Sequence, residues 1–596
     1  MAEPTQSVQL SGPQRGWNAL AQRHPVLLGM AWVAVALGIL WQFRGLEQTG
    51  DSLSYLTSVR SGTGLFHPHH LVFNMSVHVV YLVVKAVSGL DDPLVAAQIH
   101  NLGFLAVGLG AVIWIGARFL GSYGVGWLGA LLVASMTCML VFSTQGEVYV
   151  PCASLLLVAA AAGLQSLDRG SNRATVVCTL AWTGAVCYHQ AAVLFAVPIA
   201  ALVLSRPTRD GVRRLMVIAL GAGSMCASLY YLVYRIGVNP DWYGRSFGDF
   251  ILFYSLHGDP TWGDQKHLGF GGFFALFRSH IWGASSRLED AGGAVAVAVL
   301  CWIIASAGLV FWHGNREQRA LGSLSVGWIV GFGAFFLWWF PEETEFATLT
   351  NQGACLLAMA LLSFLLMNIE CRRVVVSVVV LVVTIGGVNA ASNLIDEALP
   401  RHRTRGQAYE MARSLILASP EPSLLLARHR VRQAIRYYFA DRAVDAFEVT
   451  EVERLFQRSP ERLPDRVATL VGHGIAMMAS DLRPGANFSG RNGIREPKQW
   501  LAFLGWLLDV RIESDGSLTG RSMNPAKDDP TVIVFCGPRV TYASIIDLLD
   551  QLAAVVDSAE GSRSSFSHWM RLHQDVVRDV PIIVQVPESE EYGGRQ

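Results

Sequence analysis

Long apolar segments limit this chain to folds that a membrane can hold. Of its 596 residues, 52% are hydrophobic and 15% are charged, against about 25% charged residues in soluble proteins. A helix needs about 20 apolar residues to cross a bilayer, and a window of that length selects about eleven segments. They are 26–42, 92–117, 123–142, 150–167, 174–188, 190–205, 215–236, 291–312, 321–340, 348–369 and 374–392. The sequence predicts a polytopic α-helical membrane protein of about eleven spans.

The charge balance excludes two other classes of protein. Lys+Arg and Asp+Glu both number 46, so the net charge is zero. A nucleic-acid-binding protein that acts through bulk charge needs a basic surplus, and a disordered protein needs low hydrophobicity and high net charge. Eight of the nine cysteines lie in or beside apolar segments, which is typical of small buried side chains and not of a disulfide framework.

Arginine placement predicts the topology of the chain. The segment 70–88 is apolar but contains His70, Asn74, His78 and Lys85, so its role is ambiguous. If it lies on the outer leaflet as an interfacial helix, the arginine-rich loops all fall on one side, as the positive-inside rule requires. The N-terminus is then cytoplasmic and the C-terminus outside. The arginines on the inner side are Arg118, Arg169, Arg173, Arg206, Arg209, Arg213, Arg214, Arg316, Arg319, Arg372 and Arg373.

Two domains are expected. Residues 1–392 form the membrane domain, with large outer loops at 43–91 and 237–290. After Ser392 the hydropathy falls, and 393–596 are expected to form an extracytoplasmic α/β domain, since short apolar strands there alternate with helical patterns. The expected strands are Ser423–Ala427, Val444–Val449, Thr531–Phe535 and Pro581–Val586, and the expected helices include Val431–Phe439 and Ala543–Val556. The location expected for the whole chain is a bacterial cytoplasmic membrane.

Asp51 follows the first apolar segment, in the run Gly50-Asp51-Ser52-Leu53-Ser54-Tyr55. A carboxylate just outside the membrane can act as a general base toward a hydroxyl group. Alternatively, Asp51 is the N-cap of a helix that begins at Ser52, because Asp is favoured at that position. The two roles are compatible.

Three imidazoles lie close together in the run Phe66-His67-Pro68-His69-His70. Histidines at this spacing can bind a metal ion or a substrate. Alternatively, they form a hydrogen-bonded aromatic anchor at the membrane interface. Pro68 disfavours helix at His67 and so predicts a turn before the segment 70–88.

Further candidates lie in the other outer segments. Glu147 is a lone acid between two apolar segments, either as a metal ligand or second acid, or as a favourable charge near a helix N-terminus. His189 is at the tip of the short hairpin 174–205. The loop 237–290 supplies Arg245, Lys266 and Arg278 for an anionic phosphate, while His267 is a candidate metal ligand with Glu147. The acidic turn 341–345 is expected to be a solvated surface.

These motifs together resemble the GT-C membrane glycosyltransferases, and in particular the group of protein O-mannosyltransferases and aminoarabinose transferases. Members have an acid in the first outer loop before a short helix, here Asp51 to Tyr55. A proline-containing turn and a juxtamembrane helix follow, here His67 to His70 and 70–88. Glu147 matches the acid of a second outer turn, and His189 the polar residue of a hairpin. The resemblance covers roughly 1–392. Two positions depart from the family pattern. The first acid is Asp51-Ser52, where Asp-Glu is frequent, and His189 stands where Lys is frequent.

The resemblance implies a reaction at the outer face of the membrane. The donor is a sugar linked to polyprenyl phosphate, and the acceptor is a hydroxyl group of a glycan, lipid or protein in the cell envelope. Asp51 would be the general base of an inverting transfer. Tyr55, His67, His69, His70, His189 and the cations of 237–290 would bind substrate, and a divalent cation near Glu147 is the expected cofactor, if any.

Two other functions fit the composition. The first is a transporter or flippase of lipid-linked sugars, which should place polar residues on broken helices at mid-membrane. The second is a membrane sensor or assembly protein whose C-terminal domain binds a partner. The polar residues gather at the outer ends of the apolar segments, which favours the enzyme over the transporter.

Overall fold

The structure is a computed structural model, and it divides the chain into two compact units. Unit 1 comprises Met1–Gln48 and Ser58–Thr404, and unit 2 comprises Thr49–Thr57 and Arg405–Gln596. The structure describes residues 25–205, 207–236, 246–251, 292–339, 344–368, 372–418, 423–427, 429–441, 444–448, 475–478, 511–512, 518–519, 532–535 and 582–585.

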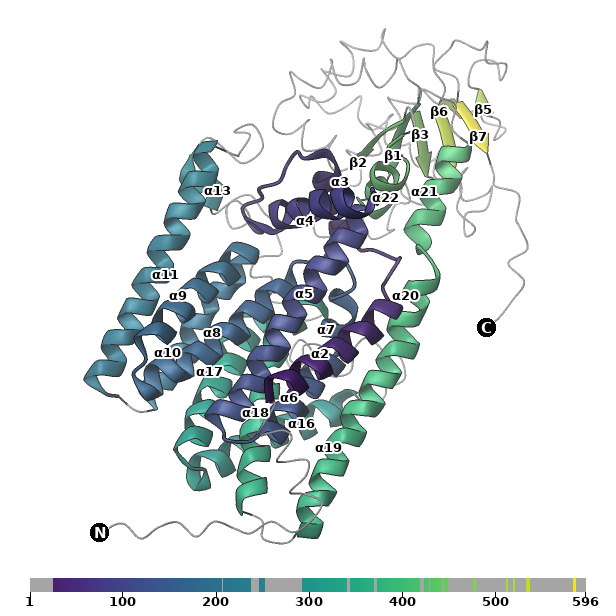
Figure 1. Cartoon of the computed structure of the whole chain (residues 1–596). Coiled ribbons are helices and arrows are strands. Elements are labelled where there is room, and N and C mark those ends of the chain that lie inside the picture. The colour runs from purple at the N-terminus through teal and green to yellow at the C-terminus, as the bar shows by residue number, and fades with distance from the viewer. Residues whose placement is uncertain are drawn as a thin grey trace, which may run out of the picture. The chain divides into compact units, whose positions relative to one another are not determined.

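Unit 1 is a bundle of helices (Figure 1). Its long helices are α2 (Pro25–Gln42), α5 (Pro93–Trp114), α8 (Tyr149–Arg169), α9 (Asn172–Tyr188), α11 (Arg209–Ile236), α16 (Gly292–His313), α17 (Arg316–Trp339), α18 (Thr344–Asn368) and α19 (Arg372–Asn393). Shorter helical elements are α4 (Phe73–Ser88), η1 (Ile115–Phe119), α6 (Tyr123–Ser135), α7 (Thr137–Phe142), η2 (Gln190–Phe195), α10 (Ala196–Leu204), α13 (Phe247–Ile251), η5 (Leu394–Ala398) and α20 (Leu399–Arg403). α3 (Gly50–Ser61) begins in unit 2 and ends in unit 1.

All eleven predicted apolar segments lie on helices. Six helical stretches are long and apolar enough to cross a membrane, namely 93–119, 149–167, 209–236, 316–338, 348–368 and 376–393. Four of the other apolar segments are shorter helices in the part of the chain that the structure describes. A multi-pass membrane protein is therefore supported, while the count of eleven spans stays a prediction.

Helix α4 lies crosswise to α5 at one end of the bundle (Figure 1). One side of α4 is buried through Phe73, Asn74, Val77 and Tyr81. The other side exposes apolar side chains, which are Val79, Leu82, Val83 and Val87. A helix with this division suits the boundary between protein and lipid, and the interfacial role expected for 70–88 stays a prediction.

The predicted span 123–142 is broken into α6 and α7. Met136, between them, has an extended backbone with φ −64° and ψ 134°. The carbonyl of Ser135 beside the break accepts hydrogen bonds from the side-chain amides of Asn389 (2.8 Å) and Asn393 (2.9 Å) on α19. Thr137 donates to Asn393 as well (2.9 Å). Irregular backbone at membrane depth is tolerated where neighbouring side chains satisfy its polar groups, and α19 does so here.

Close backbone packing joins the end of α5 to α6. Gly116 and Gly126 face each other, and a Cβ atom on either glycine would collide with the opposite backbone. The amide of Ser122 donates to the carbonyl of Gly116 (2.8 Å), which fixes the turn between them. Glycine at both positions is what lets the two helices approach this closely.

Unit 2 contains a five-stranded sheet in which neighbouring strands are parallel, with the order β2-β1-β3-β6-β7. The strands are β1 (Ser423–Ala427), β2 (Val444–Glu448), β3 (Ile475–Met478), β6 (Val532–Phe535) and β7 (Ile582–Gln585), and β4 (Arg511–Ile512) pairs antiparallel with β5 (Leu518–Thr519). α21 (Gln407–Ala418) and α22 (His429–Tyr438) pack together.

The four segments expected to be strands are strands, and β3 was missed. The expected helix Ala543–Val556 lies outside the described residues. A single α/β domain over 393–596, and the boundary at 392, stay predictions.

Candidate functional site

A β-turn presents the three clustered histidines. The amide of His70 donates to the carbonyl of His67 (3.0 Å), and Pro68 takes the second position of the turn, where its restricted φ is favoured. The Nδ1 atom of His67 accepts a hydrogen bond from the amide of His69 (3.3 Å). The expected turn at Pro68 is confirmed, and it places the three rings side by side.

His189 joins these three imidazoles from the opposite segment. Its ring centroid lies 4.6 Å from that of His69 and 5.3 Å from that of His70. His70 stacks on His69 at 4.9 Å and on His67 at 5.5 Å. The ring of Tyr149 also packs against that of His189, with centroids 4.9 Å apart. We call His67, His69, His70 and His189 the histidine cluster. The structure brings together two segments that the sequence pattern had treated as separate candidates.

Hydrogen bonding fixes the tautomer of His189. Its Nδ1 atom accepts from the amide of Ala191 (3.1 Å), so Nδ1 carries no proton. In a neutral imidazole the other nitrogen, Nε2, must then be the donor. The side chain is 2% exposed, and Nε2 has no hydrogen-bond partner among the described residues. A buried donor without a partner is unfavourable by about 1–3 kcal/mol, which makes Nε2–H a candidate ligand-binding group.

Burial keeps three members of the histidine cluster, His69, His70 and His189, uncharged. It lowers the pKa of His189 to about 3. It also lowers the pKa of His69 and His70 well below the usual value, and the neighbouring imidazoles lower both further by mutual repulsion. At neutral pH these groups are therefore hydrogen-bond donors and acceptors and not cations.

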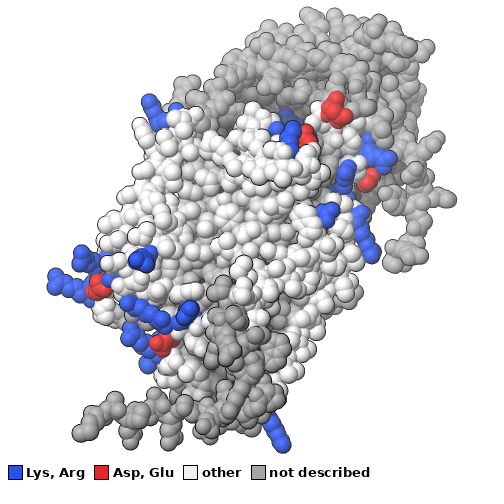
Figure 2. All heavy atoms as spheres, in the orientation of Figure 1, with Lys and Arg blue, Asp and Glu red and all other residues white. Residues whose placement is uncertain are grey.

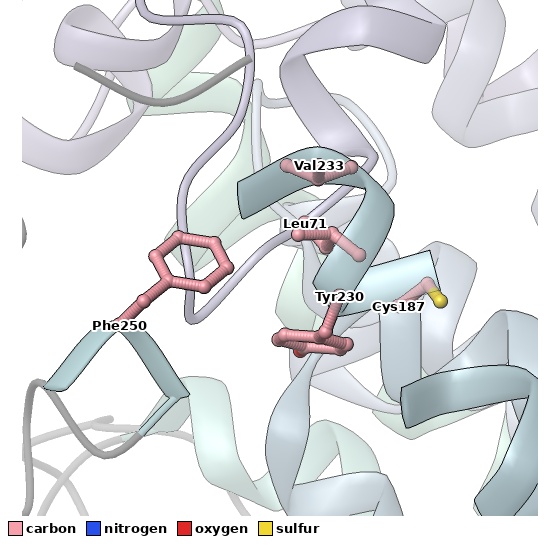
Figure 3. Close-up of a cluster of buried hydrophobic side chains, with 5 residues drawn as sticks. All are labelled: Leu71, Cys187, Tyr230, Val233 and Phe250. Atoms are coloured by element: carbon pink, nitrogen blue, oxygen red, sulfur yellow. The ribbon is translucent and has the colours of Figure 1, made fainter. Parts of the chain in front are cut away.

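A hydrophobic cluster supports the histidine-bearing turn from behind. Its buried members come from the turn, α9, α11 and α13, and Figure 3 shows them gathered around Leu71: Leu71, Cys187, Tyr230, Val233 and Phe250. The hydroxyl of Tyr230 donates to the carbonyl of Pro68 (3.0 Å). Gln190, next to His189, links the two sides, because its amide donates to the carbonyl of His69 (3.4 Å) and its side chain to that of Ile251 (3.2 Å).

Glu147 lies in a turn that is clamped by amide side chains. The Nδ2 atom of Asn101 donates to the carbonyls of Gln145 and Glu147 (both 2.8 Å) and, at 3.3 Å, to that of Phe142. Gln98 donates to the carbonyl of Thr144 (2.9 Å). Glu147 itself is 1% exposed. The acid is thus held in a rigid, buried turn and not on a solvated surface.

A second polar network connects that turn to the neighbour of His189. The amide oxygen of Asn101 can only accept, so Nδ1 of His100 donates to it (3.0 Å) and Nε2 of His100 is an acceptor. Nε2 faces the hydroxyls of Ser76 (3.0 Å) and Tyr188 (3.1 Å). α4, α5, α9 and the Glu147 turn are therefore joined through His100 and Asn101, two residues that the sequence interpretation missed.

The acidic turn 341–345 was expected to be a solvated surface; residues 341–343 lie outside the described residues, and Glu345 is half-buried. Its carboxylate accepts a hydrogen bond from the hydroxyl of Tyr149 (3.2 Å), whose ring packs against His189. Neither residue stands out in sequence, because each is a single polar position at the edge of an apolar segment. Glu345 orients Tyr149 and through it one wall of the histidine cluster.

Asp51 lies exposed in the first turn of α3, in unit 2. The N-cap of α3 is Thr49, whose hydroxyl accepts from the amide of Ser52 (3.0 Å). The interpretation of Asp51 as the cap is therefore wrong, and its position in the first turn is one that the helix dipole favours for a carboxylate. Tyr55, one turn further along α3, is partly buried.

Four predicted site residues, Arg245, Lys266, His267 and Arg278, lie outside the described residues. Across the described ranges, no group of three or more His, Cys, Asp or Glu side chains could hold a metal ion. The divalent cation expected near Glu147 stays a prediction.

No protein-family model and no curated protein matches this sequence. Two crystal structures of ArnT from Cupriavidus metallidurans are similar to the chain. The one bound to undecaprenyl phosphate has 14% sequence identity and a TM-score of 0.45, and the match covers 74% of this chain and 91% of that one. For the apo state the values are 14%, 0.43, 75% and 92%. At this level of similarity, function has to be derived from the residues of this chain.

Proposed function

We propose that this chain is an integral membrane glycosyltransferase that moves a sugar from a polyprenyl-phosphate donor to an acceptor hydroxyl outside the membrane. The observation that carries the proposal is the unpartnered Nε2–H of His189 in a buried, uncharged cluster. Such a donor suits a phosphate oxygen, and the cluster borders apolar helices that suit a lipid tail. Nucleotide sugars are not available outside the cytoplasm, so a site there needs a lipid-linked donor.

Residues of this chain can supply the base and the hydrogen-bond donor that the transfer needs. Asp51 accepts the proton of the acceptor hydroxyl, whose oxygen attacks the anomeric carbon from the side opposite the phosphate. The bond between the anomeric carbon and the phosphate oxygen breaks, and polyprenyl phosphate leaves with the bonding electrons. The sugar is transferred with inversion. His189 Nε2–H donates to a phosphate oxygen as negative charge grows there, a contribution of about 100- to 1000-fold in rate for a well-placed donor.

The transporter is the second candidate, and the break at Met136 is the observation that favours it. Broken helices line the substrate sites of many transporters. Here, however, the carbonyl of Ser135 at the break is already bonded to Asn389 and Asn393. The carbonyl at the break therefore already has its hydrogen-bond donors, and the enzyme remains the better-supported function.

The test compares purified wild-type protein with Asp51→Asn in proteoliposomes, with a panel of polyprenyl-phosphate sugars and with or without a chelator. Release of polyprenyl phosphate is expected from the wild type, with a loss of about 100-fold or more in Asp51→Asn. Asp249→Asn is the matched control, because Asp249 also lies in the first turn of a short helix but has no proposed chemical role. Full activity of Asp51→Asn would refute the base assignment. Movement of intact donor between leaflets without release would establish the transporter instead.

A further inference from the structure

Arginines gather at the end of unit 1 where α8 ends and α9 and α11 begin. Six of them lie on three neighbouring segments: Arg118, Arg169, Arg173, Arg209, Arg213 and Arg214. Figure 2 shows basic side chains grouped over this end of the bundle. The acidic residues of these segments are Asp168 and Asp210, against six arginines. The surface therefore carries a strong positive excess.

Contacts among the segments make this surface a rigid platform. Arg169 donates to the carbonyl of Arg118 (3.0 Å) and lies 5.6 Å from the ring of Phe119. Arg214 donates to the side chains of Asn172 and Asp210 (both 2.8 Å). The end of η1, the turn between α8 and α9, and the start of α11 are thereby tied together. Arg118, Arg173, Arg209 and Arg213 keep exposed side chains on that platform.

An exposed apolar surface begins one turn away from these arginines. α9 and α11 pack against each other, and both expose large aliphatic side chains in the half of the helix that follows the arginines. On α9 these are Val176 (59% exposed), Val177 (45%) and Leu180 (51%), and on α11 they are Met216 (51%), Val217 (53%) and Leu220 (63%). A ligand that covers both surfaces needs an anionic head and a hydrocarbon body.

We propose that the platform and the adjoining faces of α9 and α11 form a binding site for an anionic phospholipid. Arg173 and Arg213 bind its phosphate, since guanidinium groups pair with phosphate through two parallel hydrogen bonds. The acyl chains lie along Val176, Leu180, Val217 and Leu220. The net positive charge selects an anionic lipid over a zwitterionic one. Arg173 of this site lies at the start of α9, at the opposite end of that helix from His189, and the binding requires no glycosyl transfer.

The test uses the full chain purified in a neutral detergent, with cardiolipin as the anionic probe and phosphatidylcholine as the zwitterionic one. Binding is measured by native mass spectrometry and by the shift in thermal midpoint. Cardiolipin is expected to bind and to stabilise the wild type, and phosphatidylcholine is not. Arg173→Gln/Arg213→Gln should weaken cardiolipin binding by about 30-fold, from about 1 kcal/mol for each arginine.

The side chains of Arg173 and Arg213 are exposed, so their replacement should spare the fold. Arg316→Gln/Arg319→Gln on α17 removes the same charge outside the platform and should keep binding. Equal loss in both double variants would reduce the effect to bulk charge and overturn the site. Equal stabilisation by inorganic phosphate at matched ionic strength would show that the ligand is an anion and not a lipid.

Discussion

The hydroxyl of Tyr230 on α11 donates to the carbonyl of Pro68, 162 residues earlier, at the centre of the histidine-bearing turn. The proline has no amide hydrogen of its own to anchor the turn, so this carbonyl is one of its few polar attachments. Tyr230 thus positions His67, His69 and His70 from outside their own segment.

Tyr230→Phe keeps the ring in the hydrophobic cluster and removes only this hydrogen bond. The turn should loosen, and chemical modification by diethyl pyrocarbonate, followed by mass spectrometry, should become several times faster at His69 and His70. His100, buried in the bundle, reports global unfolding and should stay protected. Tyr231→Phe, on the exposed side of α11, is the control and should change nothing. Equal labelling in both variants would refute the positioning role.

Two substitutions separate the structural and ligand-binding roles of His189. The amide oxygen of Asn can replace Nδ1 as acceptor for Ala191, but Asn offers no equivalent of Nε2–H. His189→Asn should therefore keep the thermal midpoint while donor turnover falls by about 100-fold. His189→Ala should lose both activity and about 1 kcal/mol of stability. A His189→Asn variant that retains full turnover would show that Nε2 does not touch the donor.

Acid should destabilise the folded chain through the histidine cluster. His69, His70 and His189 stay neutral when folded, because burial lowers their pKa, but they take up protons near pH 6.5 when unfolded. The unfolded state binds more protons between pH 6.5 and about 3, so the free energy of unfolding falls as pH falls through that window. Each histidine contributes up to about 1.4 kcal/mol per pH unit.

The measurement is the thermal midpoint between pH 8 and pH 5. Wild type should show a falling midpoint below pH 6.5, and His189→Asn should show a shallower fall because one proton-binding group is gone. Identical slopes for the two proteins would contradict the assignment of a depressed pKa to His189.

The stability of the Glu147 turn should depend on the side-chain amide of Asn101, which donates the hydrogen bonds that hold it. Asn101→Leu is close in size but leaves three buried carbonyls with their Asn101 donor removed, so we expect a loss of about 3 kcal/mol or more. Gln190→Leu, which removes one side-chain bond to Ile251, is the milder comparison at about 1 kcal/mol. Denaturant titration in detergent distinguishes the two. A neutral Asn101→Leu would mean that other groups hold the turn.

Replacing either of two glycines near α5 by alanine should change stability, in opposite directions at the two positions. Gly116→Ala places a methyl group against the backbone of Gly126, and the strain should lower stability by about 1–3 kcal/mol. Gly110→Ala meets nothing within 4 Å and should raise stability by about 0.5–1 kcal/mol, because alanine favours helix. Thermal midpoints of the two variants would test both. If both variants were destabilised to the same degree, helix packing at Gly116 would not be the cause.

Much of the bundle could be predicted because a membrane-crossing helix leaves a long apolar signal. The sequence predicted helix at all eleven segments, and four of the five strands of the parallel sheet. It missed the break at Met136, since the segment 123–142 is apolar throughout and the partners of Ser135 lie on α19, more than 250 residues away.

The site could be predicted only in part. His69, His70 and His189 were candidates, but no pattern shows that separate segments meet. Tyr149, Glu345, Asn101 and Tyr230 act through hydrogen bonds that cross the fold, and a lone polar residue beside an apolar run gives no periodic signal. Asp51 was found from its position after the first apolar segment, while its cap role was misassigned because the helix begins at Gly50, before the expected Ser52, with Thr49 as the cap.

The attachment of Ser135 to α19 also sets an order of events during synthesis. The carbonyl of Ser135 leaves the ribosome 254 residues before Asn389 and 258 before Asn393. At about 5–20 residues per second, roughly 10–50 s pass between the synthesis of α6 and α7 and that of the asparagines that hydrogen-bond to Ser135. During that interval the carbonyl of Ser135 lacks its hydrogen-bond donors from α19. Truncation before α19 should therefore leave a product that the membrane quality-control proteases degrade.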